Sequence, residues 1–230
     1  MVDNFIAKPV MLRARNIQKS FYTPSCLQIL SGVDLAVHQG ESVAIMGRSG
    51  EGKSTLLQIL GTLEIPCSGE LEIDGEAVSS FNKSRIRNRK LGFVFQSFHL
   101  LEDYTALENV LMPAKIARIS CAPNSTAYQR ACHLLEHVGL EGRLHFSTKL
   151  LSGGEKQRVA IARALCNDPD IILADEPSGN LDRQTSRHIH SLLLNFVKEH
   201  NKTLIVVTHD QELAELCSQR YRLCEGRLVQ

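Results

Sequence analysis

A glycine-rich loop at residues 47–54 carries residue types that bind phosphate groups. Its letters, G-R-S-G-E-G-K-S, fit the pattern G-x-x-x-x-G-K-[ST]. Its glycines allow backbone N–H groups to surround an anion, and the N-terminus of a following helix would add partial positive charge. We expect Lys53 to reach the β- and γ-phosphates and the Ser54 hydroxyl to hold Mg²⁺. The loop therefore predicts that the chain binds a nucleoside triphosphate.

The residues on both sides of the loop support this prediction. An apolar run at 43–46 precedes the loop like a buried strand, and residues 54–60 follow it like a helix. A glycine-rich turn with an incidental lysine is the alternative, and it leaves this context unexplained. The residues that we assign to nucleotide binding here are Gly47, Arg48, Ser49, Gly50, Glu51, Gly52, Lys53, Ser54 and Thr55.

Two adjacent carboxylates, Asp175 and Glu176, end a second apolar run at 171–174. Ligands of open α/β sheets lie at the carboxyl ends of the strands, so these acids should face the phosphates. We expect Asp175 to hold Mg²⁺, directly or through water, and Glu176 to polarise the attacking water. An acidic pair after a strand is more often a solvated turn, and the upstream glycine-rich loop favours the catalytic role.

The composition excludes several classes of protein. The chain has 230 residues, with Lys+Arg 26 against Asp+Glu 25, so no overall basic field indicates a nucleic-acid partner. Its seven cysteines form no C-x₂-C pair, which favours reduced thiols in the cytosol over a zinc site or disulfides. Residues 1–4 do not resemble a secretory signal, and no apolar run approaches the ~20 residues of a membrane helix. We expect any membrane role to come through a partner.

The pattern of apolar residues divides the chain. Residues 105–150 have no strand-like run and show helical spacing, with Gly139 as a helix stop. We predict an α/β core with a β subdomain at 1–96 and 166–230, and a helical subdomain inserted at 97–165. The strand-like segments are 10–14, 33–37, 42–46, 69–75, 93–95, 171–174 and 204–207.

The string L-S-G-G-E-K-Q-R at 151–158 identifies a family. Ser152 should cap a helix, and the glycines after it allow an anion to approach the N-terminus of that helix. An ordinary helix cap would not explain why this string lies between Lys53 and the acidic pair at 175–176. Together, these motifs resemble those of ATP-binding-cassette (ABC) ATPases over almost the whole chain.

The resemblance implies a fold, two ligands and an assembly. The fold is the α/β P-loop NTPase fold of ABC ATPases, with an antiparallel β subdomain and an inserted α-helical subdomain. The ligands are ATP and Mg²⁺. Two copies close head to tail over two ATP molecules, so that Ser152, Gly153 and Gly154 of one copy cap the nucleotide of the other.

Four further positions match motifs of this family. Gln96 corresponds to a glutamine that contacts Mg²⁺ and the lytic water, and His209 to a histidine near the γ-phosphate. Asp182 ends the string S-G-N-L-D, called the D-loop, which is a dimer contact. Phe21 matches the aromatic residue that stacks on adenine, although its neighbour Tyr22 could serve instead.

The string F-V-F-Q-S-F-H-L-L at 93–101, followed by T-A-L-E-N-V, indicates a branch of the family. It resembles the ATPases of lipoprotein release and of macrolide export. Two residues depart from this pattern: Glu102 replaces the usual proline, and Glu51 lies in the phosphate loop where a small residue is common. A carboxylate near phosphate groups is unfavourable unless it points outward.

The resemblance implies an ATP-hydrolysing subunit on the cytoplasmic face of the inner membrane, held there by two separate transmembrane permease subunits. Lipoprotein release is the favoured function. The alternative is the ATPase of a macrolide or peptide exporter or of a cell-division complex. A regulatory or DNA-associated ABC module is disfavoured, because no heptad run or zinc-binding insertion lies between Lys53 and Ser152.

Two further segments bear on the partners. The basic run at 83–90 is short and lacks interleaved aromatic residues, so we expect a solvated face, with lipid headgroup contact as a lesser alternative. The apolar residues at 97–101 lie beside Gln96. They are expected to be either core of the helical subdomain or a groove that receives a short permease helix.

Overall fold

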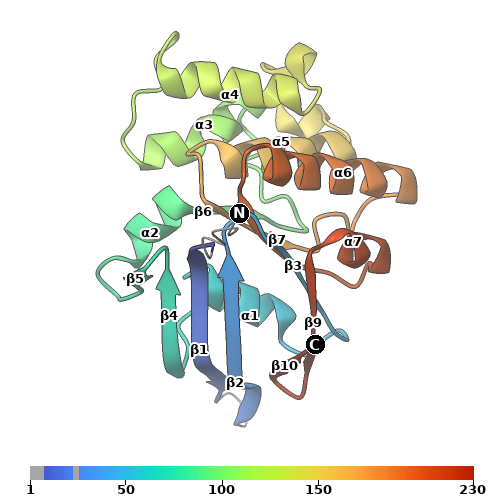
Figure 1. Ribbon diagram of the computed structural model, residues 1–230. Coiled ribbons are helices and arrows are strands. Elements are labelled where there is room, and N and C mark those ends of the chain that lie inside the picture. The colour runs from blue at the N-terminus through green and yellow to red at the C-terminus, as the bar shows by residue number, and fades with distance from the viewer. Residues whose placement is uncertain (1–7, 23–25) are drawn as a thin grey trace, which may run out of the picture.

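The strands of the protein form two sheets. The computed structural model describes residues 8–22 and 26–230, and within these ranges one sheet has six strands and the other has four. Figure 1 shows the four-stranded sheet on one side of the six-stranded sheet and most of the helices on the other. The prediction that the chain lacks a secretory signal concerns residues 1–4, which lie outside the described ranges.

The six-stranded sheet positions the phosphate loop. Its strands run parallel except for β10, which pairs with β9 in the antiparallel sense at one edge. The phosphate loop begins at the end of β3, which is an interior strand of this sheet. In spatial order the strands are β10 (Arg227–Val229), β9 (Gln219–Cys224), β3 (Ser42–Met46), β8 (Thr203–Val207), β7 (Ile171–Asp175) and β6 (Leu91–Val94).

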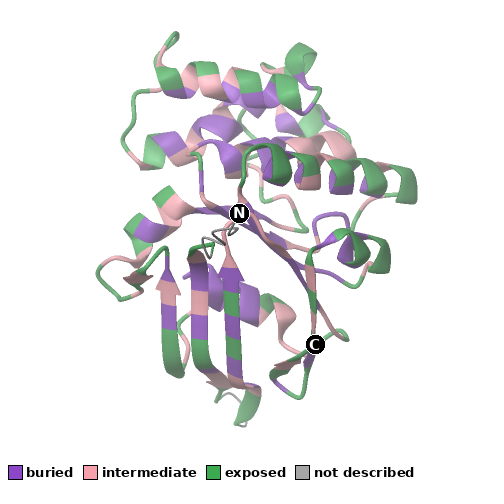
Figure 2. Cartoon of the chain, viewed as in Figure 1, coloured by how far each residue is buried: buried purple, intermediate pink, exposed green. Residues whose placement is uncertain are grey.

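The inner strands of this sheet are buried on both faces. In β8, Leu204 and Val206 belong to one apolar core, and Ile205 and Val207 belong to the other. Since successive side chains of a strand point to opposite faces, the two cores lie on opposite sides of the sheet. This burial explains why β7 and β8 are continuous apolar runs instead of alternating ones. Figure 2 shows the buried residues concentrated along the sheets and on the helix faces turned toward them.

The four-stranded sheet shares one of these cores. Leu12 and Val33 from this sheet pack in the same cluster as Ile45 and Val207 from the six-stranded sheet. All of its strand pairs are antiparallel, as the family resemblance implied. In spatial order its strands are β2 (Leu27–His38), β1 (Val10–Phe21), β4 (Ser68–Ile73) and β5 (Glu76–Ala77).

The helices cover both faces of the six-stranded sheet. Helix α1 packs in the core shared with the antiparallel sheet, whereas α3 to α7 contribute side chains to the other core. Figure 1 shows α3, α4, α5 and α6 gathered on the side away from β1 and β2. The helices are α1 (Lys53–Leu60), α2 (Lys83–Lys90), α3 (Ala106–Ile116), α4 (Thr126–His137), α5 (Gly153–Leu165), α6 (Arg183–Glu199) and α7 (Gln211–Leu216). No helix in the described part of the chain is both long and apolar enough to cross a lipid bilayer.

The structure corrects several predicted boundaries. The strand expected at 93–95 is β6, Leu91–Val94, because Leu91 and Gly92 extend the parallel pairing with β7. The strand expected at 33–37 belongs to β2, which begins at Leu27. The basic run at 83–90 forms α2, whose one buried residue is Ile86. The helical subdomain at 97–165 stays a prediction, and α3, α4 and α5 all lie in that segment.

Candidate nucleotide-binding site

The phosphate loop joins β3 to α1 in the predicted way. Gly50 and Gly52 have φ angles of +84° and +92°, which L side chains rarely adopt. Gly52 is the N-cap of α1, so the loop ends at the positive end of that helix. A Cβ atom on Gly52 would lie 2.3 Å from the Ile29 side chain, so glycine is also required by packing.

The lysine and the serine of the loop reach different groups. Lys53 Nζ donates to the carbonyl oxygens of Gly47 and Arg48 at 3.0 and 2.9 Å. Ser54 Oγ donates to Asp175 Oδ1 at 3.1 Å, and so links the first helix to the end of β7. Burial raises the pKa of the Asp175 carboxyl and the charge of Glu176 raises it further, although the Ser54 hydrogen bond opposes this shift.

Glu176 lies against the turn that follows β8. Its Oε2 is 2.9 Å from His209 Nδ1 and accepts a hydrogen bond from the His209 backbone N–H at 3.3 Å. The side chain of Glu176 is 14% exposed, whereas that of His209 is 71% exposed. A partly buried carboxylate beside an accessible imidazole is suited to orienting a water molecule and moving its proton.

Gln96 and the D-loop are joined by two hydrogen bonds. Gln96 Nε2 donates to Asn180 Oδ1 at 3.3 Å, and Asn180 Nδ2 donates to the Gln96 carbonyl at 3.1 Å. A Cβ atom on Gly179 would lie 2.8 Å from Gln96 Nε2, so the approach requires glycine. The next residues lead to Asp182, which caps α6 by accepting from the N–H groups of Gln184 and Thr185.

One cavity, of about 500 Å³, brings most of the predicted residues together. Residues of the phosphate loop and the three predicted catalytic residues line it together. Ile29 of β2 also lines it, and no sequence motif indicated that residue. The lining residues are Ile29, Gly47, Ser49, Gly50, Gly52, Lys53, Ser54, Thr55, Gln96, Glu176 and His209.

Phe21, predicted to stack on adenine, does not line this cavity. It ends β1, is 42% exposed, and has Lys19 Nζ 5.1 Å from its ring centroid. Its neighbour Tyr22 is 71% exposed. Both rings are accessible to a ligand, so the choice between them stays open.

The L-S-G-G-E string forms the start of α5, away from the cavity. Ser152 accepts from the Glu155 N–H, and the Glu155 carboxylate accepts from the Ser152 N–H, which is a capping box. The backbone hydrogen bond from Ser152 lowers the pKa of the Glu155 carboxyl. Ser152 and Gly153 are exposed, so this helix N-terminus is open to a group outside the subunit.

A further residue of the same helix connects it to the catalytic loop. The fully buried Gln157 donates through Nε2 to the Pro177 carbonyl at 2.6 Å. Pro177 directly follows Glu176, so α5 positions the chain next to the proposed catalytic residue. Gln157 follows the motif by two residues, and its polar side chain on a buried helix face was the available sequence signal.

Glu51 does not point away from the loop. Its Oε2 accepts a hydrogen bond from the Arg48 backbone N–H at 2.6 Å, and a Cβ atom on Gly47 would lie 2.6 Å from it. A negative charge therefore lies within the loop that is predicted to receive phosphate groups. It reduces the positive potential of the site.

The sequence and the fold of this chain match those of known proteins. A model of the ABC transporter family matches residues 30–179. The chain belongs to the ABC transporter family. It is an ABC ATPase, as the P-loop and the L-S-G-G-E string predicted.

Related ABC proteins match over nearly the whole chain. A lipoprotein-releasing system ATP-binding protein, LolD, of Protochlamydia amoebophila is 65% identical over 95% of this chain and 96% of its own length. LolD of Bacteroides fragilis is 45% identical over 95% of this chain and all of its own length. A solved structure of the ATP-binding cassette MJ0796, dimeric after hydrolysis and bound to ADP and Pi, has a TM-score of 0.87. It is 39% identical and covers 96% of this chain and 97% of its own. The predicted ABC ATPase fold is confirmed.

Proposed function

We propose that this ABC ATPase hydrolyses ATP to drive the release of lipoproteins from a membrane. The proposed hydrolysis rests on the cavity that Lys53 and Ser54 line together with Gln96, Glu176 and His209. The choice of lipoproteins as the cargo rests on the likeness to LolD proteins, which extends over 95% of the chain. An exporter or cell-division ATPase is the alternative, and no specific contact in the structure favours it.

The hydrolytic step uses groups of this chain. The loop N–H groups and Lys53 bind and orient the phosphates, and Glu176 accepts the proton of the attacking water. His209 lies 2.9 Å from Glu176 through Nδ1 and holds the carboxylate on the cavity side of the 208–210 turn. Gln96 lines the cavity and donates a hydrogen bond to Asn180 of the D-loop.

Ser54, Asp175 and Gln96 fit a magnesium ion. The hydroxyl of Ser54 and the carboxylate of Asp175 are already in contact at 3.1 Å. Burial raises the pKa of the Asp175 carboxyl, and a bound cation would favour its charged form. Hydroxyl, carboxylate and amide oxygens are ligands that Mg²⁺ prefers. When bound, the ion would neutralise charge on the phosphate oxygens.

We further propose a head-to-tail dimer. Ser152 and Gly153 are exposed at the N-terminus of α5, where a second copy could present its ATP. Asp182 lies on the exposed D-loop, which supports its proposed role at the same interface. The solved MJ0796 cassettes, which have the same fold, are dimeric.

The membrane partners proposed are two separate permease subunits, which hold the ATPase on the cytoplasmic face of the inner membrane. A groove of about 630 Å³ between α2, β6, α3 and α5 supports a docking place beside Gln96. Its lining includes Phe93, Phe95, Met112 and Ile116. Of residues 97–101, only His99 lines it, whereas Leu100 packs in the core.

A depletion experiment in the source cell tests the cargo. Loss of this chain should leave lipidated lipoproteins in the inner membrane, and wild-type chain supplied from a plasmid should restore their release. The Glu176→Gln variant should not restore it. Normal lipoprotein distribution after depletion, with a defect in drug efflux or cell division instead, would favour the alternative functions.

A further inference from the structure

A buried histidine lies next to the proposed catalytic groups. His190 is on α6, on the helix face formed by Ile189, Leu193 and Phe196, and it is 2% exposed. Ser186 is the other buried polar residue of this helix, and the remaining buried residues are apolar, so the imidazole needs polar contacts. Burial lowers the pKa of His190, which keeps the ring neutral.

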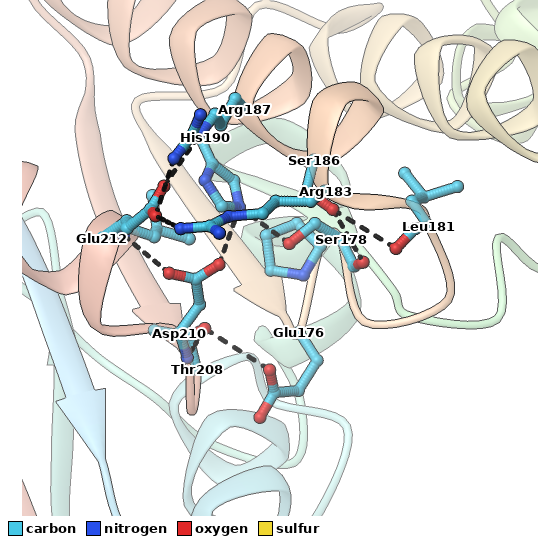
Figure 3. Close-up of polar contacts among 12 residues, drawn as sticks. Glu176, Ser178, Leu181, Arg183, Ser186, Arg187, His190, Thr208, Asp210 and Glu212 are labelled. Atoms are coloured by element: carbon cyan, nitrogen blue, oxygen red, sulfur yellow. Dashed lines mark hydrogen bonds and ion pairs between the residues drawn. The ribbon is translucent and has the colours of Figure 1, made fainter.

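The ring contacts the loops that carry the catalytic groups. Its Nε2 is 2.7 Å from Ser178 Oγ and 4.0 Å from Asp210 Oδ2. Ser178 lies two residues after Glu176, and Asp210 directly follows His209. Figure 3 shows His190 above this pair of loops, with Ser178 and Asp210 on its lower side.

Asp210 lies at the start of a helix, whereas Ser178 lies in a loop that is hydrogen-bonded to the first turn of α6. Asp210 caps α7 by accepting from the Leu213 N–H at 3.1 Å. On the other loop, Ser186 Oγ donates to the Asp182 carbonyl at 2.9 Å and ties the D-loop to the first turn of α6. Glu176 also bonds the turn directly, and the buried ring of His190 adds a second contact between the two loops.

Ion pairs at the surface also join α6 to α7, close to the buried contact of His190. Glu212 of α7 bonds Arg187 through two nitrogens, at 2.8 and 2.9 Å, and Arg183 at 2.6 Å. These side chains are 45 to 79% exposed, and exposed pairs contribute little. The buried hydrogen bond of His190 is the stiffer connection, because water cannot replace it.

We propose that His190 is a positioning residue for ATP hydrolysis. Its hydrogen bond to Ser178 holds the 177–182 loop in register with the 208–210 turn, and so sets the place of Glu176 relative to His209. The inference rests on the proposed roles of Glu176 and His209. It adds a residue that does not line the nucleotide cavity.

Steady-state ATPase kinetics of the full chain test the proposal. His190→Leu keeps the apolar packing and removes the hydrogen bond, Ser178→Ala removes its partner, and His190→Gln keeps a neutral polar group of similar reach. His188→Leu, at an exposed position of the same helix, is the control. We expect kcat to fall about 3- to 10-fold in His190→Leu and Ser178→Ala, with KM within about twofold. His190→Gln should recover at least half of kcat.

Several outcomes separate this role from a structural one. The double variant should be no slower than either single variant, because both remove one shared contact. Independent, multiplying losses would overturn the proposal, as would a folded His190→Leu with normal kcat. A fall in melting temperature without a kcat effect in the folded fraction, unrescued by glutamine, would leave only a packing role. If Glu176→Gln still hydrolyses ATP, the proposed function fails whatever the His190 variants do.

Discussion

Glu176 has a backbone conformation that is unusual for its residue type. Its φ angle is +45°, in the left-handed region where side chains other than glycine are uncommon. Two hydrogen bonds hold it there: its N–H donates to the Val207 carbonyl at 2.9 Å, and its carbonyl accepts from Gly179 at 3.0 Å. The strained turn redirects the carboxylate from the end of β7 toward His209.

We expect Glu176→Gln to lower ATP turnover by about 10²- to 10⁴-fold while ATP binding survives. The amide has the same shape as the carboxylate and cannot accept the proton. Binding would be measured with a fluorescent ATP analogue, and hydrolysis by phosphate release. Near-normal hydrolysis in this variant would remove the assignment of Glu176 as the base.

Glu51 offers a second test at a single residue. Glu51→Gln keeps an oxygen that can accept the Arg48 N–H and removes the charge from the phosphate loop. We expect the Kd for ATP to fall about two- to fivefold, because repulsion between the carboxylate and the phosphates is lost. The gain should shrink at high salt, which screens that repulsion. An unchanged or weaker affinity would show that the carboxylate lies away from the bound phosphates.

Among the elements, α5 carries the clearest test of the assembly. A carboxylate added at its N-terminus should block the neighbouring nucleotide of a partner subunit. Gly153→Asp is the better choice, because a Cβ atom on Gly154 would lie 2.7 Å from Thr185 Cγ2 and disturb the subunit itself. At Gly153 the nearest atom is a Leu181 methyl at 3.3 Å, which a small side-chain shift accommodates.

Mixed dimers then distinguish shared sites from separate ones. In a head-to-tail dimer, pairing Lys53→Ala in one subunit with Gly153→Asp in the other leaves one intact composite site and measurable ATPase. Placing both changes in one subunit and pairing it with wild type should leave none. The reverse pattern would mean that each active site lies within a single subunit.

Helix α3 tests the proposed permease groove. Ile116 lines the groove and is 68% exposed, so Ile116→Asp should leave the fold and the basal ATPase intact. We expect loss of stimulation when the purified subunit is added to its permease in proteoliposomes, since a charge would be buried at the contact. Ile65→Asp, at a similarly exposed position outside the groove, is the control and should stay responsive.

The elements differed in how far the sequence revealed them. The strands β7 and β8 are unbroken apolar runs because both faces are buried, so their positions were predictable. Helix α2 was not predicted, because its eight residues contain five cations and one apolar side chain and show no period. Strand β9 has three exposed residues and one buried residue among its six, so it also shows no continuous apolar run.

In the candidate site too, residues in contiguous motifs were predictable from the sequence, whereas residues brought in from distant segments were not. The phosphate loop and the Asp175–Glu176 pair are contiguous in sequence, and their chemistry follows from a few adjacent residues. Ile29 and His190 have no such local signal, since they reach the site only through β2 and α6. Their contacts depend on packing between elements far apart in the chain, which a single sequence does not display.

For the whole molecule, acid should weaken the fold through His190. Its native pKa lies below the ordinary value of 6.5, chiefly because the ring is buried, although Asp210 and Glu212 partly oppose the shift. The unfolded chain therefore binds more protons, and the contribution of the neutral ring is lost as pH falls from about 6.5 toward the native pKa. Urea unfolding at pH 7.5 and 5.5 should show a smaller acid loss in His190→Leu than in wild type. His188→Leu should match wild type, and equal acid losses in all three would contradict the prediction.

Hydrogen exchange in the central strand β8 should report the binding of ATP to the protein. All five of its residues are buried, and β3 and β7 flank it on both sides. Its amide protons can exchange with deuterium only when the whole chain opens, so their rate measures the global free energy of unfolding. Saturation with ATP at about 100 times its Kd should slow that exchange roughly 100-fold, although no residue of β8 lines the nucleotide cavity.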